Sequence, residues 1–183
     1  RTFDSIFWHN YHSKLWRQSS NHMSNLLVQN IKHTNGTTAQ TVNSSGYVVM
    51  PNRPYFNGQT TTQSVAGSTQ VVLVASSTHH NNGSHYNTSD GKFTAPVSGV
   101  YTFSGSVSMN ATSGYLFISH VSSGGSSIQE YYGNQTNGSN DSLTRYQCGA
   151  TFYMAAADYI QFVTAHFTST HDVSHVINGA FIG

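Results

Sequence analysis

The side chains of this sequence that could carry chemistry are amides, tyrosines and histidines rather than acids or nucleophiles. Asp and Glu together number only 6 in 183 residues. The sequence contains no Gly-x-Ser-x-Gly, paired acidic or phosphate-loop motif. Glu130 and Asp141 form the one acidic pairing of note, which we attribute to coincidence. We therefore expect a binding or structural protein, not an enzyme.

Planar amides and exposed aromatic rings suit a carbohydrate, which offers hydroxyl groups for hydrogen bonds and apolar ring faces for stacking. Such residues gather in segments that we expect to be long loops. The alternative is that the amides are turn formers and the tyrosines are packed. The expected ligand-binding residues are Asn82, Tyr131, Tyr132, Asn134, Asn137, Asn140, Asp141 and Asp172.

Histidines fall in the same segments, and Asp172 lies among them. One histidine from each of three subunits could hold a metal ion on a threefold axis, which makes His166, His171 and His175 weak candidate ligands. Solvated loop histidines are the favoured interpretation, so we expect no cofactor and leave a metal ion at the tip as an alternative. Six of the 11 histidines belong to this set: His79, His80, His85, His166, His171 and His175.

The composition excludes several classes of partner. The 7 Lys and Arg residues are scattered and cannot neutralise a phosphate track, so we expect no nucleic acid. No long apolar run is present, so we expect no membrane insertion. Charged residues make up 7% of the chain, and uncharged Gly, Ser, Thr and Asn favour sheets and tight turns. The expected fold class is all-β.

A regular strand pattern begins near Pro51 and is clearest in VSGVYTFSGSVSM at 97–109. There the apolar residues Tyr101, Phe103 and Val107 alternate with Thr and Ser, which predicts one core face and one wet or paired face. Several short strands separated by turn residues indicate a sandwich or jelly roll. Further strands are expected at 114–121, 127–132, 143–154, 158–165 and 175–183.

The first 50 residues differ from the rest. Residues 1–22 hold both tryptophans, and MSNLLVQNI from Met23 is typical of a natural start. We interpret 1–22 as a segment added in cloning, with an aromatic linker as the alternative. Residues 23–50 predict a trimerising β-hairpin stub with a type I′ turn at Asn35-Gly36, too small to hold its own core.

The stretch DGKFTAPVSGVYTF at 90–103 places Phe93 six residues before a Gly99-x-Tyr101-x-Phe103 triplet. This spacing resembles the signature of the C1q domain, the globular head shared with tumour-necrosis-factor-like jelly rolls. Three other stretches resemble strands of that family, so the resemblance covers about residues 51–183. It implies a ten-stranded jelly-roll sandwich that assembles as a threefold homotrimer. The other stretches are RPYF at 53–56, AADYIQF at 156–162 and NGAFIG at 178–183.

The residues also favour self-association on their own terms. The segments YQCGATFYM at 146–154 and HVINGAFIG at 175–183 carry apolar residues on both strand faces, so a solvated outer face is not expected. A closed trimer would bury the second face and make binding multivalent. The residues assigned to the core or the trimer are Phe93, Gly99, Tyr101, Phe103, Phe152, Ile177 and Phe181.

Strand alternation sorts the connections between the two ends of the sandwich. The short turns PVSG, SSGGSS and MAAAD should share one end. The long polar segments should lie at the opposite, distal end, which is the expected binding face. These segments are 77–90, 108–114, 133–142 and 166–175.

The stub is similar to the lead-in of tail-fibre and related virion proteins of marine phages, through VQNIKHTNGTTAQTVNSSGYVVMPNRPYF at 28–56. The collagen stalk or coiled coil more usual in animal C1q proteins is absent there. The resemblances imply the receptor-binding head of a phage tail fibre or related virion protein, exposed on the virion. Its partners would be its own copies, other virion subunits and a bacterial surface glycan or protein. A structural fibre-tip protein and a secreted C1q-domain lectin or ligand are the alternatives.

Overall fold

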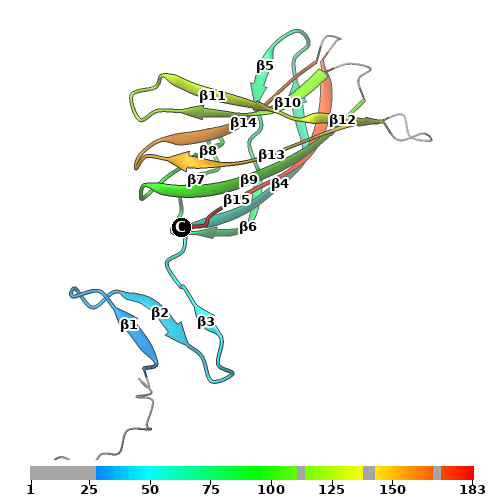
Figure 1. The fold of residues 1–183 in the computed structure, drawn as a ribbon. Coiled ribbons are helices and arrows are strands. Elements are labelled where there is room, and N and C mark those ends of the chain that lie inside the picture. The colour runs from blue at the N-terminus through cyan, green and yellow to red at the C-terminus, as the bar shows by residue number, and fades with distance from the viewer. Residues whose placement is uncertain (1–27, 111–113, 138–142, 167–169) are drawn as a thin grey trace, which may run out of the picture. The chain divides into compact units, whose positions relative to one another are not determined.

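The computed structural model describes residues 28–110, 114–137, 143–166 and 170–183 (Figure 1). Within these ranges all regular structure is β-strand, and no helix is long and apolar enough to cross a membrane. The chain divides into two compact units, Arg1–Val49 and Met50–Gly183. We call residues 28–49 the stub and residues 50–183 the head.

The stub is a three-stranded antiparallel sheet of β1 (Asn30–Lys32), β2 (Thr38–Val42) and β3 (Val48–Val49). The predicted hairpin is present, but the predicted type I′ turn is wrong. That turn needs two residues with positive φ, and here only Gly36 has one, at 88°. Asn35 instead accepts a hydrogen bond from the Thr37 amide through its side-chain oxygen, at 2.9 Å.

No residue of the stub is buried. Its apolar side chains therefore have no core of their own to enter, as expected for so small a sheet. The large hydrophobic residues exposed on it are Val28, Ile31, Val42, Tyr47, Val48 and Val49.

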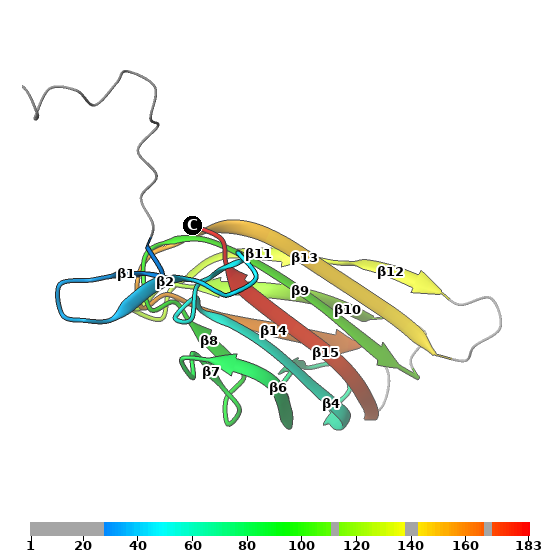
Figure 2. The same ribbon diagram turned by 90° about the horizontal axis from the view of Figure 1, so that it is seen from below.

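The head is a sandwich of two six-stranded antiparallel sheets, which confirms the all-β jelly-roll prediction. The first, here called the β9 sheet, has the order β12-β13-β9-β15-β4-β6, and Figure 2 shows its long strands side by side. Its strands are β4 (Tyr55–Val65), β6 (Ser77–Asn82), β9 (Gly99–Met109), β12 (Asn134–Asn137), β13 (Thr144–Met154) and β15 (His171–Phe181).

The second sheet, here called the β10 sheet, has the order β11-β10-β14-β8-β7, with β5 also paired to β14. At one of its connections to the first sheet, the chain passes from β11 to β12 through Gly133. The amide of Gly133 donates a hydrogen bond to the Leu116 carbonyl at 2.8 Å. A Cβ there would overlap the Gln147 carbonyl, so the crossing requires glycine. The strands are β5 (Gln70–Val72), β7 (Tyr86–Asn87), β8 (Lys92–Thr94), β10 (Gly114–Val121), β11 (Ser127–Tyr132) and β14 (Tyr159–His166).

Aromatic rings from both sheets fill the core. Phe93 of β8 meets Tyr101 and Phe103 of β9 edge-on, with ring centroids 5.8 and 5.5 Å apart. Gly99 lies beside Phe181, and a Cβ at Gly99 would come within 2.5 Å of that ring. The spacing of the 90–103 motif thus reflects packing. Of the other expected core or trimer residues, Ile177 is fully buried, and Phe152 and Phe181 are partly buried against the core.

The short turns meet at one end of the sandwich, the end where β15 finishes, which we call the base. Asp158 links two of them, because its carboxylate accepts hydrogen bonds from the amides of Ser123 and Ala155 at 3.0 and 3.1 Å. The Ala156 amide in turn donates to the hydroxyl of Ser98 in the third turn, at 2.9 Å. The three short turns therefore share one end, as the alternation predicts.

The segment 77–90 lies at the base, contrary to prediction. After β4 the chain enters the other sheet as β5, and β6 then returns along the first half of β4, so that Asn82 pairs with Tyr55. The prediction missed β5 and therefore missed one reversal of chain direction. The opposite end, which we call the far end, is where Met109 pairs with Thr144 and Gly114 with His166.

Candidate functional site

The predicted ligand residues do not form one cluster. Asn137 pairs with Thr144 at the far end, and exposed Asp172 lies near the start of β15 at the same end. Asn134 is exposed at the start of β12, the end of that strand that lies away from Asn137. Asn140 and Asp141 lie outside the described residues.

Asn82 has a structural position at the base instead. Its side-chain amide donates to the carbonyls of Pro51 and Arg53, at 2.8 and 2.7 Å, and so fixes the start of the head. His80 lies beside Tyr55, with ring centroids 5.7 Å apart, and His79 is on the same strand. His85 lies against Phe93, and burial lowers its pKa. These three histidines therefore do not share the far end with His171.

The three candidate metal ligands also separate. His175 is 3% exposed inside the head, where it pairs with Thr60 and Val107, and burial lowers its pKa to about 4. His171 is half-buried at the far end. The backbone of His166 ends β14, and its side chain lies outside the description. No group of three His, Cys, Asp or Glu side chains within the described ranges could hold a metal ion.

The two adjacent tyrosines of β11 differ in burial, because successive residues of a strand face opposite sides of the sheet. Tyr131 is packed, with its ring stacked on Phe152 at 4.5 Å. Tyr132 is 60% exposed and lies on Phe117, at 4.9 Å and an interplanar angle of 25°. The packed alternative thus holds for Tyr131 and not for Tyr132.

Tyr132 belongs to a group of three rings on the outer face of the β10 sheet. Tyr132 was a predicted ligand residue, but its two neighbours in this group were not predicted. Tyr115 lies 5.8 Å from both Phe117 and Tyr132, and its hydroxyl accepts a hydrogen bond from Gln70 at 3.3 Å. We call Tyr115, Phe117 and Tyr132 the Tyr132 cluster. The signal was available in GYLFISHV, where Tyr115 and Phe117 alternate with the core residues Leu116 and Ile118.

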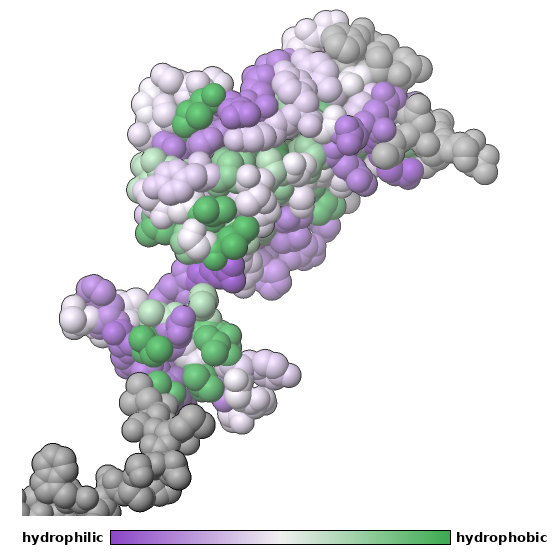
Figure 3. Space-filling model, in the orientation of Figure 1, coloured by the Kyte–Doolittle hydropathy of each residue, from purple (hydrophilic) through white to green (hydrophobic). Residues whose placement is uncertain are grey.

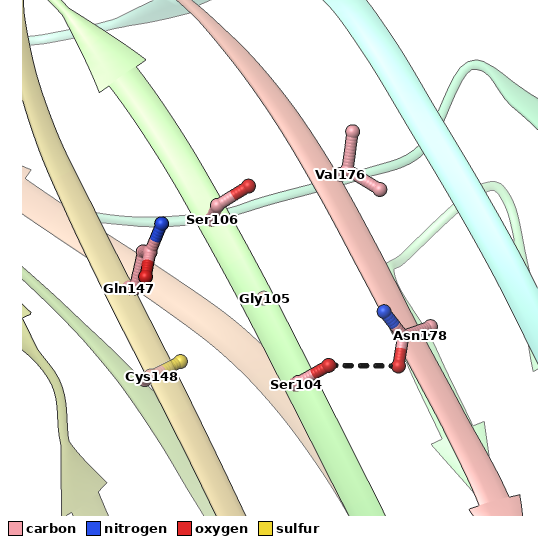
Figure 4. A pocket seen from close by; sticks show the side chains of 7 residues that line it. All are labelled: Ser104, Gly105, Ser106, Gln147, Cys148, Val176 and Asn178. Atoms are coloured by element: carbon pink, nitrogen blue, oxygen red, sulfur yellow. Dashed lines mark hydrogen bonds between the residues drawn. The ribbon is translucent and has the colours of Figure 1, made fainter.

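The outer face of the β9 sheet carries two neighbouring hollows of about 210 Å³ each. Figure 4 shows the first, where the Ser104 hydroxyl donates to the Asn178 side-chain oxygen at 2.9 Å. Both hollows share Ser106 and Val176, and neither is lined by Lys, Arg, Asp or Glu. Their other lining residues are Gly105, Gln147 and Cys148 in the first, and Gln59, Thr60, Thr61, Ser108, Ser174 and His175 in the second.

Cys148 lines the first hollow but is not a reactive thiol. It is 7% exposed, it packs in the core, and burial raises the pKa of its thiol to about 12. The thiolate needed for nucleophilic or metal chemistry is therefore strongly disfavoured at neutral pH.

Apolar side chains stand on the same outer face of the β9 sheet. Val100, Tyr153, Val176 and Ile182 are 37, 62, 41 and 49% exposed. Hydrophobic residues of the head also lie near the base in the view of Figure 3, which has the orientation of Figure 1. The outer face of the β9 sheet thus combines an apolar base with a middle rich in hydroxyl and amide groups.

Comparisons with solved structures identify the fold. The globular domain of zebrafish complement 1qA protein superposes with a TM-score of 0.57 at 16% identity, covering 72% of this chain and 98% of that one. Murine APRIL gives 0.52 at 8% identity over 71% and 99%, and Eiger TNF from S. frugiperda gives 0.50 at 9% over 72% and 92%. At these identities the likeness shows the fold alone.

Sequence comparison identifies the family. No curated protein matches this chain. The C1q domain family matches residues 55–172, which include Phe93, Gly99, Tyr101 and Phe103. Because that match spans more than half of the sequence and agrees with the fold, the chain belongs to the C1q domain family.

Proposed function

We propose that this chain is the receptor-binding head of a phage tail fibre or related virion protein, which forms a homotrimer and holds a glycan of the bacterial surface. The observation that carries the proposal is the outer face of the β9 sheet. Val100, Tyr153 and Val176 stand exposed there, on strands whose opposite face already fills the core. A second apolar face is typical of a sheet that is covered by another subunit.

The charge distribution supports association through this face. On the central strands β9, β13 and β15, the outward-facing charged residues are Arg145 and Asp172, both near the far end. Between them and the base the outward side chains are uncharged. Covering such a surface costs little desolvation of charge.

The stub supports assembly independently. Its strands expose Ile31, Val42 and Val48 and bury none of their residues. A unit this small that buries none of its residues is not expected to be stable alone, whereas copies supplied by two further chains could pack their apolar residues together. The resemblance of the stub to phage fibre lead-ins supports the proposal that this assembly belongs to a virion.

A trimer would turn weak glycan contacts into firm attachment. Three identical heads on one fibre, and several fibres on one particle, raise the effective concentration of each later contact. The amide of exposed Asn134 and the exposed ring of Tyr132 are suited to a polar ligand with apolar ring faces.

A structural fibre-tip protein is the second candidate. One observation favours it: exposed apolar side chains that support self-association share the outer face of the β9 sheet, whereas the predicted ligand residues are divided between the base, where Asn82 lies, and the far end, where Asp172 lies. Such a protein would trimerise and terminate the fibre without holding a receptor.

One experiment separates the two. The purified chain is first tested for a trimer by sedimentation equilibrium, and the labelled trimer is then applied to a panel of bacterial cells before and after removal of surface polysaccharide. We expect binding to at least one strain that is lost on stripping. A trimer that binds no cell would favour the fibre-tip protein, and a monomer would overturn both.

A further inference from the structure

The Tyr132 cluster presents an open aromatic surface. One face of the Tyr132 ring lies on Phe117, yet 60% of the residue is exposed, so the other ring face is turned to solvent. Tyr115 stands beside it with its ring tilted by 55°. The two tyrosines therefore form a shallow corner above a buried phenylalanine.

Polar groups flank the corner on two sides. On the β11 side, Glu130 accepts a hydrogen bond from the Tyr132 hydroxyl at 2.6 Å, which fixes both the ring and the carboxylate. On the β5 side, the Gln70 amide donates to the Tyr115 hydroxyl at 3.3 Å. Gln70 pairs with Ala165, which in turn pairs with Tyr115, so the two polar groups lie on opposite flanks of the rings.

We propose that the Tyr132 cluster is a subsite for an uncharged pyranose ring. The apolar C–H face of the sugar would stack on the open face of Tyr132, while its hydroxyl groups donate to the Glu130 carboxylate and exchange hydrogen bonds with Gln70 and the Tyr115 hydroxyl. Because Glu130 is the one charged group in this set, an acidic sugar is repelled. The inference rests on the proposed glycan-binding function and names its ligand class and its place.

The subsite is compatible with the proposed trimer. The cluster lies on the outer face of the β10 sheet, whereas the face proposed for self-association belongs to the β9 sheet. The two faces are on opposite sides of the sandwich. Each of three subunits could therefore hold a sugar, which is the arrangement that multivalent attachment needs.

The first test uses the full chain and monovalent probes: the methyl glycosides of glucose, galactose and N-acetylglucosamine, and galacturonic acid as an acidic counterpart. Binding is measured by saturation-transfer NMR titration. We expect millimolar binding of at least one neutral glycoside, weakened about tenfold or more in Tyr132→Ala and kept in Tyr132→Phe. Glu130→Gln should reduce the discrimination against galacturonic acid.

Ile128→Ala is the matched control, because Ile128 is 51% exposed on β11, the same strand as Tyr132, and belongs neither to the Tyr132 cluster nor to the proposed trimer face. Equal losses in Tyr132→Ala and Ile128→Ala would overturn the subsite, as would no binding of any neutral glycoside. Unfolding temperatures of all variants establish that each is folded.

Cell binding distinguishes this inference from the proposed function. Polysaccharide-dependent cell binding that Tyr132→Ala retains would overturn the subsite and leave the receptor-binding function standing. Glycoside binding that depends on Tyr132, from a trimer that attaches to no cell, would support the subsite and overturn the receptor function.

Discussion

The head and the stub are both built from antiparallel strands, but only the head has a core. In the head, Phe93, Tyr101 and Ile177 are fully buried between two sheets. In the stub, three strands make a single layer in which even Val48 is 59% exposed. Hydrogen bonding alone gives little net stability in water, because unfolded strands bond to solvent instead. From this difference we expect the head to fold by itself and the stub to depend on assembly.

The largest expected effect is on the head core. Phe93→Ala removes the ring that contacts both Tyr101 and Phe103 and leaves a cavity, so it should lower the free energy of unfolding by about 3–5 kcal/mol. Urea denaturation measures this. Ile128→Ala, at a residue that is 51% exposed and outside the proposed trimer face, is the control and should change stability far less. A small loss for Phe93→Ala would mean that the core repacks and that the contrast with the stub is weaker than it looks.

The next effect comes from acid. His175 has a pKa of about 4 in the folded head, below its ordinary value of 6.5, because burial disfavours the charged ring. As pH falls from about 6.5 to 4, the unfolded chain binds a proton that the folded head does not, so this group alone lowers stability by about 3 kcal/mol. Above pH 6.5 it has no effect.

Unfolding measured at pH 7 and pH 4.5 checks this for the head. His175→Gln should flatten the profile, whereas the exposed His79→Gln should leave it unchanged. If the free energy of unfolding of the unsubstituted chain did not decrease between pH 7 and pH 4.5, His175 would have to be accessible to water in the folded state.

A smaller effect is expected at the base. Asp158 is 6% exposed, accepts amide hydrogen bonds from Ser123 and Ala155, and lies 3.4 Å from His120. Asp158→Ala leaves these donors unpaired and should cost about 1–3 kcal/mol in thermal or urea unfolding. The exposed Asp172→Ala is the matched control. Equal losses for the two would argue that the short turns at the base do not depend on this carboxylate.

The smallest effect on the head should follow a change in the stub. Val48→Asp places a charge on an exposed strand, so the unfolding of the head should change by less than about 0.5 kcal/mol. The proposed trimer, however, should be weaker, so that its dissociation begins at a higher protein concentration than in the unsubstituted chain, which sedimentation equilibrium measures. Ser44→Asp, in a turn, is the control for added charge. A destabilised head would break the comparison, because the stub would then contribute to its fold.

Part of the candidate site could be predicted and part could not. The period-2 pattern identified β9 and its buried face, and the three short turns were assigned to one end correctly. The sequence did not reveal that β5 joins the opposite sheet, because three residues between turns carry little pattern. The prediction therefore placed Asn82 at the far end, whereas the structure has it at the base.

The long strands such as β9 and β13, the alternation around Tyr101 and Phe103, and the family could all be derived from the sequence, since these depend on local spacing. Which of two apolar faces enters the core became clear only from the folded structure. It placed Tyr131 inside and Tyr132 outside, and it buried His175, because such choices depend on how strands distant in sequence pair and pack.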